Sequence, residues 1–223
     1  MKLYFHPVSV TSRPVLLFLE DNNIDCEKQV VDLMTGEHHQ PPFVTLNPSR
    51  LVPVLDDDGF VLTESSAILK YLAEKIGSST YPKELKARAR VNERMDWLNT
   101  QFYREYGYHL VYPQVYPNHK RPTDDIQNGT IAWGRERAQT ALQVLNDHMI
   151  GDNKYLCGNE LTIADYLASC MVTAGDLINA DFSKYPNIAR WVSSMRALPN
   201  WAKVNEVHNG FAASQKEKQF VSI

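Results

Sequence analysis

The sequence predicts a small α/β domain with the element order β-α-β followed by β-β-α, and then an all-α helical C-terminal domain. The first part of the chain alternates short apolar runs with helical patterns, whereas the rest repeats apolar residues only at helical spacing. Between them, residues 77–82 have the Gly, Ser, Thr and Pro content of a linker. We therefore expect one domain at residues 1–78 and a second at residues 86–223.

The chain is expected to begin with a β-α-β unit. The apolar run that starts at Lys2 is short enough for a strand, and Val15–Leu19 has the character of the inner face of a helix that continues to about Asn22. An apolar segment from Cys26 to Leu33 then supplies the second strand.

A β-β-α unit follows. Prolines at positions 41, 42, 48 and 53 predict that no helix forms in that stretch. Asp56–Phe60 separates two short apolar runs and contains the Asp and Gly residues of a tight turn, which predicts an antiparallel hairpin. Thr63–Ser66 then introduces a helix that Gly77 ends.

The second domain is predicted to be entirely helical. Three apolar stripes at helical spacing support this: Val91, Met95, Leu98 and Phe102; Ile131, Ala138, Leu142, Leu145 and Met149; and Ile188, Val192, Met195 and Leu198. Thr162 and Asp165 have the spacing of a capping box, which predicts the start of a further helix.

Composition and charge argue against several classes of partner. The formal net charge is −3, so no concentrated basic surface is expected for nucleic acid or for anionic lipid. No apolar stretch approaches the roughly 20 residues of a membrane span, and the first residues lack a signal-type apolar region. We expect a cytoplasmic protein with neither nucleic acid nor membrane as a partner.

No metal site is expected. The three cysteines (Cys26, Cys157 and Cys170) have no CxxC spacing, which argues against a disulfide framework or a zinc site. His38 and His39 are adjacent, so their side chains diverge, and no further ligands lie at metal-binding spacing.

Two serines stand between the first strand and the first helix. Ser12 precedes Arg13-Pro14, as expected for a residue that caps the helix with its hydroxyl. Ser9 lies three residues earlier, too early to cap that helix, and is either an ordinary loop serine or free to face a ligand. Glu64-Ser65 has two similar interpretations: the start of a helix, or a site for the free amino-acid end of a ligand.

The densest aromatic stretch, residues 102–116, contains five tyrosines. Most of them are expected in the core or an interface, but one stripe cannot bury every face, and the remaining rings suit a pocket for apolar ligands. The sequence contains no GxGxxG, Walker, GxSxG or HExxH motif, which argues against the common nucleotide-binding, esterase and zinc-protease classes.

In this order and spacing, these segments resemble the soluble (cytosolic) glutathione S-transferases, most closely the serine-dependent theta, phi and delta classes. The residues that carry the resemblance are Lys2-Leu3-Tyr4, Ser9–Arg13, Val31-Asp32-Leu33, Gly36-Glu37-His38, Asn47-Pro48, Val52-Pro53, Phe60–Ser65, Ala67-Ile68 and Leu161–Asp165. The resemblance spans nearly the whole chain and implies a thioredoxin-like N-terminal domain followed by a helical substrate-binding domain.

The resemblance also implies roles for individual residues. Ser9 is similar to the serine that hydrogen-bonds the sulfur of glutathione, the co-substrate. Val52, positioned by a cis Pro53, would offer its backbone to the cysteinyl part. The other implied roles concern the γ-glutamyl end (Glu64 and Ser65), the glycine carboxylate (His38, His39 and Arg50) and the electrophile pocket (Tyr103, Tyr106 and Tyr112). Leu51 departs from the Lys or Gln of theta and phi enzymes, so Arg50 or His39 is expected to supply the missing cation.

One hydroxyl at the start of the first helix is sufficient for this chemistry. A thiol with a pKa of about 8.5 is only about 3% thiolate at pH 7, and lowering that pKa by about 2 units takes roughly 2.7 kcal/mol. A hydrogen bond to a charged acceptor contributes about 1.5–3 kcal/mol, and a helix N-terminus about 0.3–1 kcal/mol more. Ser9 is therefore expected to act as a hydrogen-bond donor, with the glutathione thiolate as the nucleophile.

The resemblance implies a detoxifying homodimeric enzyme that conjugates glutathione to small apolar electrophiles. Two alternatives stay open: a glutathione-dependent disulfide or peroxide reductase, and a non-catalytic binding or assembly module. The first usually requires a cysteine where this chain has Ser9, and the retention of Ser9, Glu64 and Ser65 argues against the second.

Overall fold

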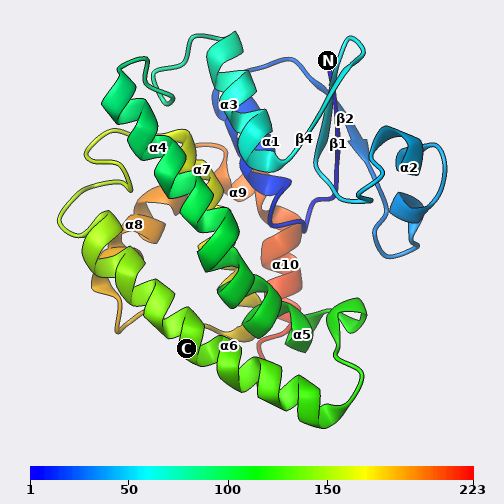
Figure 1. Cartoon of the computed structure of the whole chain (residues 1–223), viewed down its shortest axis with the longest axis vertical. Helices are drawn as coiled ribbons and strands as arrows, with labels where there is room; N and C mark the ends of the chain where they lie inside the picture. Colours follow the sequence, from blue (N-terminus) through cyan, green and yellow to red (C-terminus); the bar gives the residue numbers. More distant parts are fainter.

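A four-stranded mixed sheet forms the N-terminal part of the protein, for which a computed structural model describes residues 1–223. The strands lie in the order β2-β1-β3-β4, with β1 and β2 parallel and the other neighbours antiparallel. The elements are β1 (Lys2–Phe5), α1 (Arg13–Asp21), β2 (Glu27–Val30), η1 (Glu37–His39), α2 (Phe43–Leu46), β3 (Val54–Asp57), β4 (Phe60–Thr63) and α3 (Ser65–Lys75). The β-α-β and β-β-α order is confirmed (Figure 1).

The two faces of the sheet pack against different partners because strand side chains alternate. Leu3 and Leu55 belong to the main core together with residues of α1 and α3. Tyr4 and Val54, on the opposite face, pack in a smaller cluster with Phe43 of α2. Helices therefore cover both faces, and the loops at the carboxyl end of β1 and before β3 are left to form a site.

The proline-rich stretch differs from its prediction. A one-turn helix, α2, forms between the prolines at positions 42 and 48, preceded by the 3₁₀ turn η1. Pro42 stands immediately before the first turn of α2, where the missing N–H would have no helical partner, so proline is compatible with a helix beginning there. The prolines limit the length of the helix but do not prevent it.

The predicted hairpin and helix end are confirmed. Asp58 and Gly59 connect β3 to β4 with φ values of +53° and +93°, the positive pair that matches the twist of an antiparallel hairpin. The pairing places Val54 opposite Thr63. Gly77, at φ +64°, follows the end of α3 in the left-handed conformation that favours glycine.

The start of α1 differs from expectation. Ser12 lies at the N-cap position, but its backbone is already helical (φ −80°, ψ −39°), and its buried hydroxyl has no hydrogen-bond partner. A capping side chain reaches the first amides from an extended backbone, which Ser12 does not have. The Ser12 N–H instead donates to Ser9 Oγ at 3.2 Å. Ser9, expected to be too early to cap, thus takes part in starting the helix.

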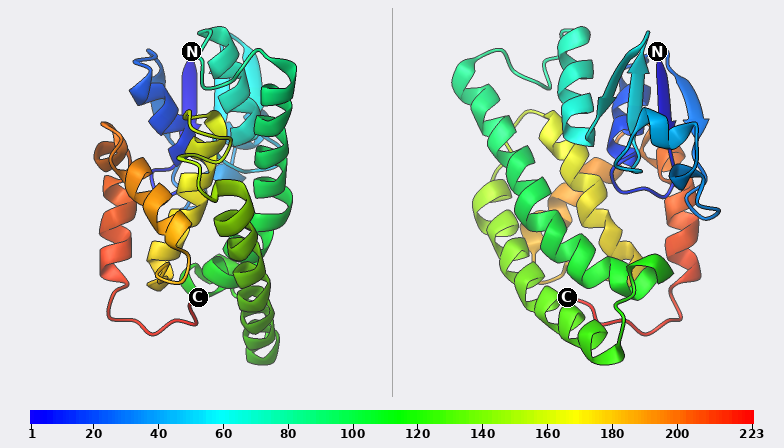
Figure 2. Two further views of the ribbon diagram at one scale, coloured as in Figure 1. Left: turned by 90° about the vertical axis from the view of Figure 1, so that its left-hand side faces the viewer. Right: turned by 45° about the vertical axis from the view of Figure 1, so that its right-hand side comes forward.

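The remainder of the chain is helical, as predicted, and Figure 2 shows its long helices beside the sheet domain. α7 lies between α1 and α4, so the two parts of the molecule share one core. The elements are α4 (Leu85–Trp97), η2 (Leu98–Phe102), η3 (Arg104–Val111), α5 (Tyr112–Val115), η4 (Pro117–His119), α6 (Asp124–Val144), η5 (Leu145–Ile150), α7 (Ile163–Val172), η6 (Thr173–Ile178), α8 (Pro186–Arg196), α9 (Trp201–Val204) and α10 (Glu206–Ser214). None of these helices combines the length and the apolar character needed to cross a membrane.

Buried polar groups join the two parts. Arg13 is fully buried, and its guanidinium donates to Asn205 Oδ1 at 2.6 Å and to the Cys170 carbonyl at 3.1 Å. The hydroxyl of Tyr166 donates to Asp21 at 3.1 Å. These bonds run from the first and last residues of α1 to the second domain, so they fix both ends of α1 relative to the helical domain.

The predicted capping box is confirmed and belongs to a larger network. Asp165, fully buried in the first turn of α7, accepts from the N–H and hydroxyl of Thr162 at 2.9 and 2.8 Å. It also accepts from the Leu156 N–H at 2.9 Å and the Trp191 indole N–H at 3.0 Å. One carboxylate therefore organises α7, the preceding loop and α8.

His208 should make stability depend on pH. Its ring is buried and faces the carbonyl of Thr173 at 3.1 Å; burial, followed by the charge of Arg13, lowers its pKa to about 3. The unfolded chain, with a histidine pKa of about 6.5, binds the proton first as pH falls. This histidine therefore costs no stability above about pH 6.5 and progressively more between about pH 6.5 and pH 3.

We expect His208→Gln, whose side-chain amide can donate in place of the ring N–H but does not titrate, to lose less stability on acidification. Between about pH 7 and pH 4.5 the difference should reach about 2–3 kcal/mol, from two pKa units at 1.36 kcal/mol each. Urea unfolding of both proteins at the two pH values measures it. If the wild type and His208→Gln lost equal unfolding free energy between the two pH values, His208 would not be the group whose protonation destabilises the fold.

Candidate active site

A cavity of about 510 Å³ opens between the sheet domain and the helical domain. The sheet domain contributes the turn after β1 and the loops on either side of α2, and the helical domain contributes an aromatic wall from η3, α5 and η4. Ser9, His38, His39, Arg50, Val52, Tyr103 and Tyr112, all singled out in the sequence, line it.

Ser9 lies half-buried in the turn that joins β1 to α1. Its N–H donates to the His6 carbonyl at 3.0 Å, which fixes the turn. Its carbonyl accepts from the N–H groups of Ser12 and Arg13 at 3.2 and 3.1 Å. Its Oγ is 3.1 Å from Thr11 Oγ1 and accepts from the Ser12 N–H. The hydroxyl therefore has a defined position at the positive end of α1.

Thr11 connects Val52 to Ser9 on the wall of the cavity. Thr11 Oγ1 donates to the Val52 carbonyl at 2.9 Å. The Val52–Pro53 peptide bond is cis, as the family resemblance implies. Val52 precedes β3, whose pairing begins at Val54, so the strand ladder does not use the Val52 N–H. A backbone edge is thus offered beside the Ser9 hydroxyl.

Asn47 builds the loop that presents Val52. Its buried side chain accepts from the Ser49 N–H at 3.0 Å and donates to the Leu51 carbonyl at 2.8 Å. Arg50 adopts φ +59° within this loop and is exposed, so its guanidinium is free to meet an anion at the rim of the cavity. Leu51 is also exposed on the cavity wall and supplies no charge.

The two histidines form a pair on the same rim. The rings of His38 and His39 lie 3.9 Å apart between centroids. Burial, with a smaller contribution from His39, lowers the pKa of His38. His38 is therefore neutral at pH 7 and can give a hydrogen bond, whereas Arg50 retains a permanent charge.

Glu64 and Ser65 lie at the junction of β4 and α3. Glu64 is exposed with φ +66°, and Ser65 is buried as the first residue of α3. Neither lines the 510 Å³ cavity. Glu64 nevertheless acts on the aromatic wall, because its charge adds to burial in raising the pKa of Tyr108.

The aromatic wall is larger than predicted. The Tyr103 and Tyr112 hydroxyls are hydrogen-bonded to each other, and their rings meet edge to face at 5.8 Å. Tyr108, Tyr116 and His119 also line the cavity, and each contacts Tyr112 with centroids 5.0–5.2 Å apart. The aromatic stretch in the sequence predicted an aromatic wall. It did not predict which of its rings would face the cavity.

Tyr106 does not line the cavity, which corrects the expectation for this residue. It is fully buried, its ring is 5.0 Å from that of Phe102, and its hydroxyl donates to the Val172 carbonyl at 3.2 Å. Gly175 makes room for it, since a Cβ there would lie 1.9 Å from the Tyr106 hydroxyl oxygen. Tyr106 continues the apolar stripe of Val91–Phe102 by four residues, a signal that could have placed it in the core.

The wall carries no charge at neutral pH. Burial raises the pKa of Tyr103, Tyr112 and Tyr116, in the last case to about 12. Burial, followed by the charge of Arg121, lowers the pKa of His119. The cavity therefore joins a hydroxyl and backbone edge on one side to neutral aromatic rings on the other, an arrangement suited to a polar ligand that meets an apolar one.

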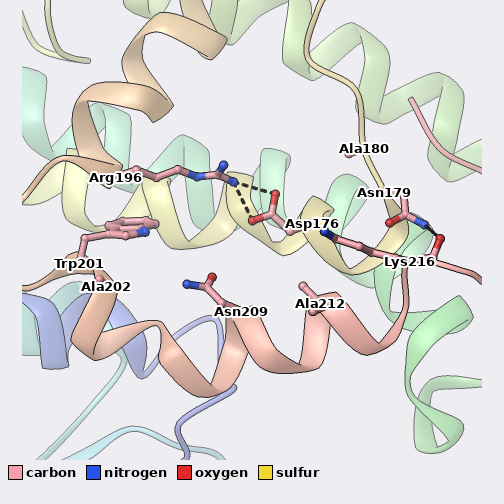
Figure 3. A pocket seen from close by; sticks show the side chains of 10 residues that line it. Asp176, Asn179, Ala180, Arg196, Trp201, Ala202, Asn209, Ala212 and Lys216 are labelled. Atoms are coloured by element: carbon pink, nitrogen blue, oxygen red, sulfur yellow. Dashed lines mark hydrogen bonds and ion pairs between the residues drawn. The ribbon is translucent and has the colours of Figure 1, made fainter.

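A second cavity, of about 550 Å³, lies among η6, α9 and α10, and is distinct from this site (Figure 3). The ion pair between Arg196 and Asp176, at 2.8 Å, lies on its wall, and Trp201 and Asn209 also line it. No residue predicted to act in catalysis or binding lines this cavity.

Two family models match separate parts of the chain. Residues 8–75 match the glutathione S-transferase N-terminal domain family, and residues 131–199 match the glutathione S-transferase C-terminal domain family. The chain is 34% identical to a delta-class glutathione transferase of Nilaparvata lugens, with 96% of this chain and 98% of that chain covered and a TM-score of 0.82.

Two further solved structures are similar over almost their full length. Glutathione S-transferase unclassified 2 from Bombyx mori is 30% identical, with 99% of both chains covered and a TM-score of 0.82. Human glutathione S-transferase T1-1 is 29% identical, with 98% of this chain and 92% of that chain covered and a TM-score of 0.83. From the two family matches and this identity over nearly the whole length, we conclude that the chain belongs to the glutathione S-transferase family.

Proposed function

We propose that Ser9 donates a hydrogen bond to the thiolate of bound glutathione, which then attacks a small apolar electrophile held against the tyrosine wall. Residues 1–78 would bind glutathione and residues 86–223 would bind the electrophile. The observation that carries this proposal is the position of the Ser9 hydroxyl, at the positive end of α1 and in the same cavity as Tyr103 and Tyr112.

The free energy needed to lower the pKa of the glutathione thiol matches what Ser9 and the N-terminus of α1 can supply. Lowering a thiol pKa by about 2 units takes roughly 2.7 kcal/mol, and one hydrogen bond to an anion contributes about 1.5–3 kcal/mol. The first-turn amides of α1 converge on Ser9, so the helix adds a further favourable contribution of about 0.3–1 kcal/mol. No base is required beyond solvent, which takes the thiol proton.

In this proposal, glutathione binds along the edge of the sheet domain. The Val52 backbone, set by Pro53, would pair with the cysteinyl unit. The γ-glutamyl ammonium would meet Glu64, and its carboxylate would meet Ser65 and the N-terminal amides of α3. Arg50, His38 and His39 would hold the glycine carboxylate. Leu51 supplies no cation, so Arg50, which is exposed at the rim, is the strongest of these three.

The electrophile is assigned to the neutral aromatic wall. Rings that meet edge to face and hold no charge favour an uncharged apolar molecule over an ion. In a displacement, the sulfur forms a bond to carbon and the leaving group departs with its electron pair. In an addition, the sulfur forms the same bond and solvent protonates the acceptor atom.

Turnover of a substrate panel tests this proposal. Halides, epoxides, isothiocyanates and peroxides would be assayed with glutathione, together with retention on immobilised glutathione. We expect retention and conjugation of the halides or other carbon electrophiles. Turnover of peroxides alone would indicate the reductase alternative, and neither retention nor turnover would indicate a non-catalytic module; both results would overturn the proposal.

Homodimerisation, a cytoplasmic location and a role in detoxification are proposed on the family resemblance. Sedimentation at micromolar concentration tests the first of these. A monomer under those conditions would contradict it.

A further inference from the structure

Thr11 joins the two parts of the proposed glutathione site. Its Oγ1 is 3.1 Å from Ser9 Oγ and 2.9 Å from the Val52 carbonyl oxygen, so one side chain connects the hydroxyl assigned to the sulfur with the backbone assigned to the cysteinyl unit. Thr11 is half-buried and lines the cavity. No sequence pattern predicts a role for Thr11.

The direction of these hydrogen bonds follows from the protons available. A carbonyl oxygen can only accept, so the single Thr11 hydroxyl proton is directed at Val52. The Ser9 hydroxyl accepts from the Ser12 N–H, and its own proton is therefore directed at Thr11 Oγ1. In this arrangement the Ser9 proton is engaged by Thr11 and must rotate to reach a sulfur.

We infer that Thr11 is a positioning residue that couples binding of the glutathione backbone at Val52 to donation of the Ser9 proton to the sulfur. When the cysteinyl N–H takes over the Val52 carbonyl, the Thr11 proton turns to Ser9 Oγ. The Ser9 proton then turns to the thiolate. The Thr11 and Ser9 O–H bonds stay intact throughout; the one bond that breaks is the S–H bond of the thiol, whose proton leaves to solvent. This inference rests on the proposed function of Ser9.

Both rotations of the hydroxyl groups are energetically favourable. A hydrogen bond to an anionic sulfur is stronger than one to a neutral hydroxyl, so the Ser9 proton gains by leaving Thr11. Donation from Thr11 to Ser9 Oγ polarises the Ser9 O–H bond and strengthens its own donation. The β-branched Thr11 side chain has few accessible rotamers, which keeps its oxygen between the two partners.

Titration of thiolate absorbance in bound glutathione tests the inference with two variants. Thr11→Val keeps the branched shape but cannot donate or accept, and we expect the pKa of the bound thiol to rise by about 0.5 to one unit. Below both pKa values the thiolate fraction, and with it kcat, would fall about three- to tenfold, with a smaller change at higher pH. Thr11→Ser restores the hydroxyl and should return both values toward those of the wild type.

Controls separate this inference from the proposal on which it rests. Thr140→Val removes an exposed hydroxyl that bonds only its own helix in α6, so it should leave the titration unchanged. Because Thr11 acts through Ser9, the double variant Ser9→Ala, Thr11→Val should match Ser9→Ala alone. An unchanged or lower thiol pKa in folded Thr11→Val, with a raised one in Ser9→Ala, would overturn the inference only. An unchanged thiol pKa in Ser9→Ala would overturn the proposed function.

Discussion

Ser9→Ala should reduce conjugation by about tenfold or more near pH 6.5, with a deficit that shrinks as pH rises above about 8.5. Without the hydroxyl, the bound thiol returns toward its ordinary pKa, so at low pH far less of it is ionised. The remaining thiolate is more basic and intrinsically more nucleophilic, which offsets part of the loss. Steady-state kcat/KM for the electrophile, measured at saturating glutathione across this pH range, reports the effect. A deficit that is independent of pH would contradict thiolate stabilisation.

Ser12→Ala is the matched control for that variant. Ser12 is three residues from Ser9 on the same turn, but its buried hydroxyl has no partner, so its removal should leave conjugation unchanged and cost no stability. Ser9→Ala removes an acceptor from the Ser12 N–H and should cost about 1 kcal/mol in unfolding free energy. This small cost separates a loss of catalysis from a loss of folded protein.

Asp165→Ala should cause the largest loss of stability of the changes considered, about 3–5 kcal/mol in unfolding free energy. The fully buried carboxylate accepts four hydrogen bonds, from Thr162, Leu156 and Trp191, and truncation leaves all four donors without this partner. Urea unfolding of the purified protein measures the change.

Asp181→Ala provides the comparison for Asp165→Ala. Asp181 also accepts from a neighbouring backbone N–H and hydroxyl, those of Ser183, at 2.9 and 2.8 Å, but it is exposed, so water can replace it. We expect a loss of about 1 kcal/mol or less. If the two variants lost equal stability, the account of α7 as organised by a buried carboxylate would be wrong.

The strands, the hairpin and the helical domain were predictable because each has a local signal. Alternating apolar runs, the Asp58-Gly59 turn and the Thr162–Asp165 spacing act over a few residues and depend little on the rest of the fold. The one-turn helix α2 was missed, since a helix that short begins after one proline and ends before another without breaking any rule.

The tyrosine wall shows why site residues are harder to assign. Residues Leu98–Val111 are largely π-helical, so the spacing of side chains around the helix differs from the 3.6 residues expected from sequence. Tyr103 and Tyr108, five residues apart, consequently share the cavity wall, while Tyr106 stays in the core with the apolar stripe that precedes it. A sequence pattern can identify such a segment as aromatic and half-buried, but the local winding decides which ring meets a ligand.

The start of α1 illustrates a second limit. A serine before proline predicts a cap, and that pattern favoured Ser12. The turn at His6–Ser9 instead brings Ser9 Oγ to the Ser12 N–H, so the residue assigned to chemistry also supports the helix. Thr11 likewise gains its assigned role only because the fold brings Val52, 41 residues away in sequence, within hydrogen-bond distance.

The most direct test of the central claim is the ultraviolet absorbance of glutathione thiolate titrated on the wild-type protein and on Ser9→Ala at saturating glutathione. If Ser9 stabilises the anion, the wild-type protein will show a bound thiol with a pKa about 2 units below the ordinary value of about 8.5, and Ser9→Ala will return it toward that value. Two superimposable titration curves from folded proteins with glutathione bound would contradict the claim.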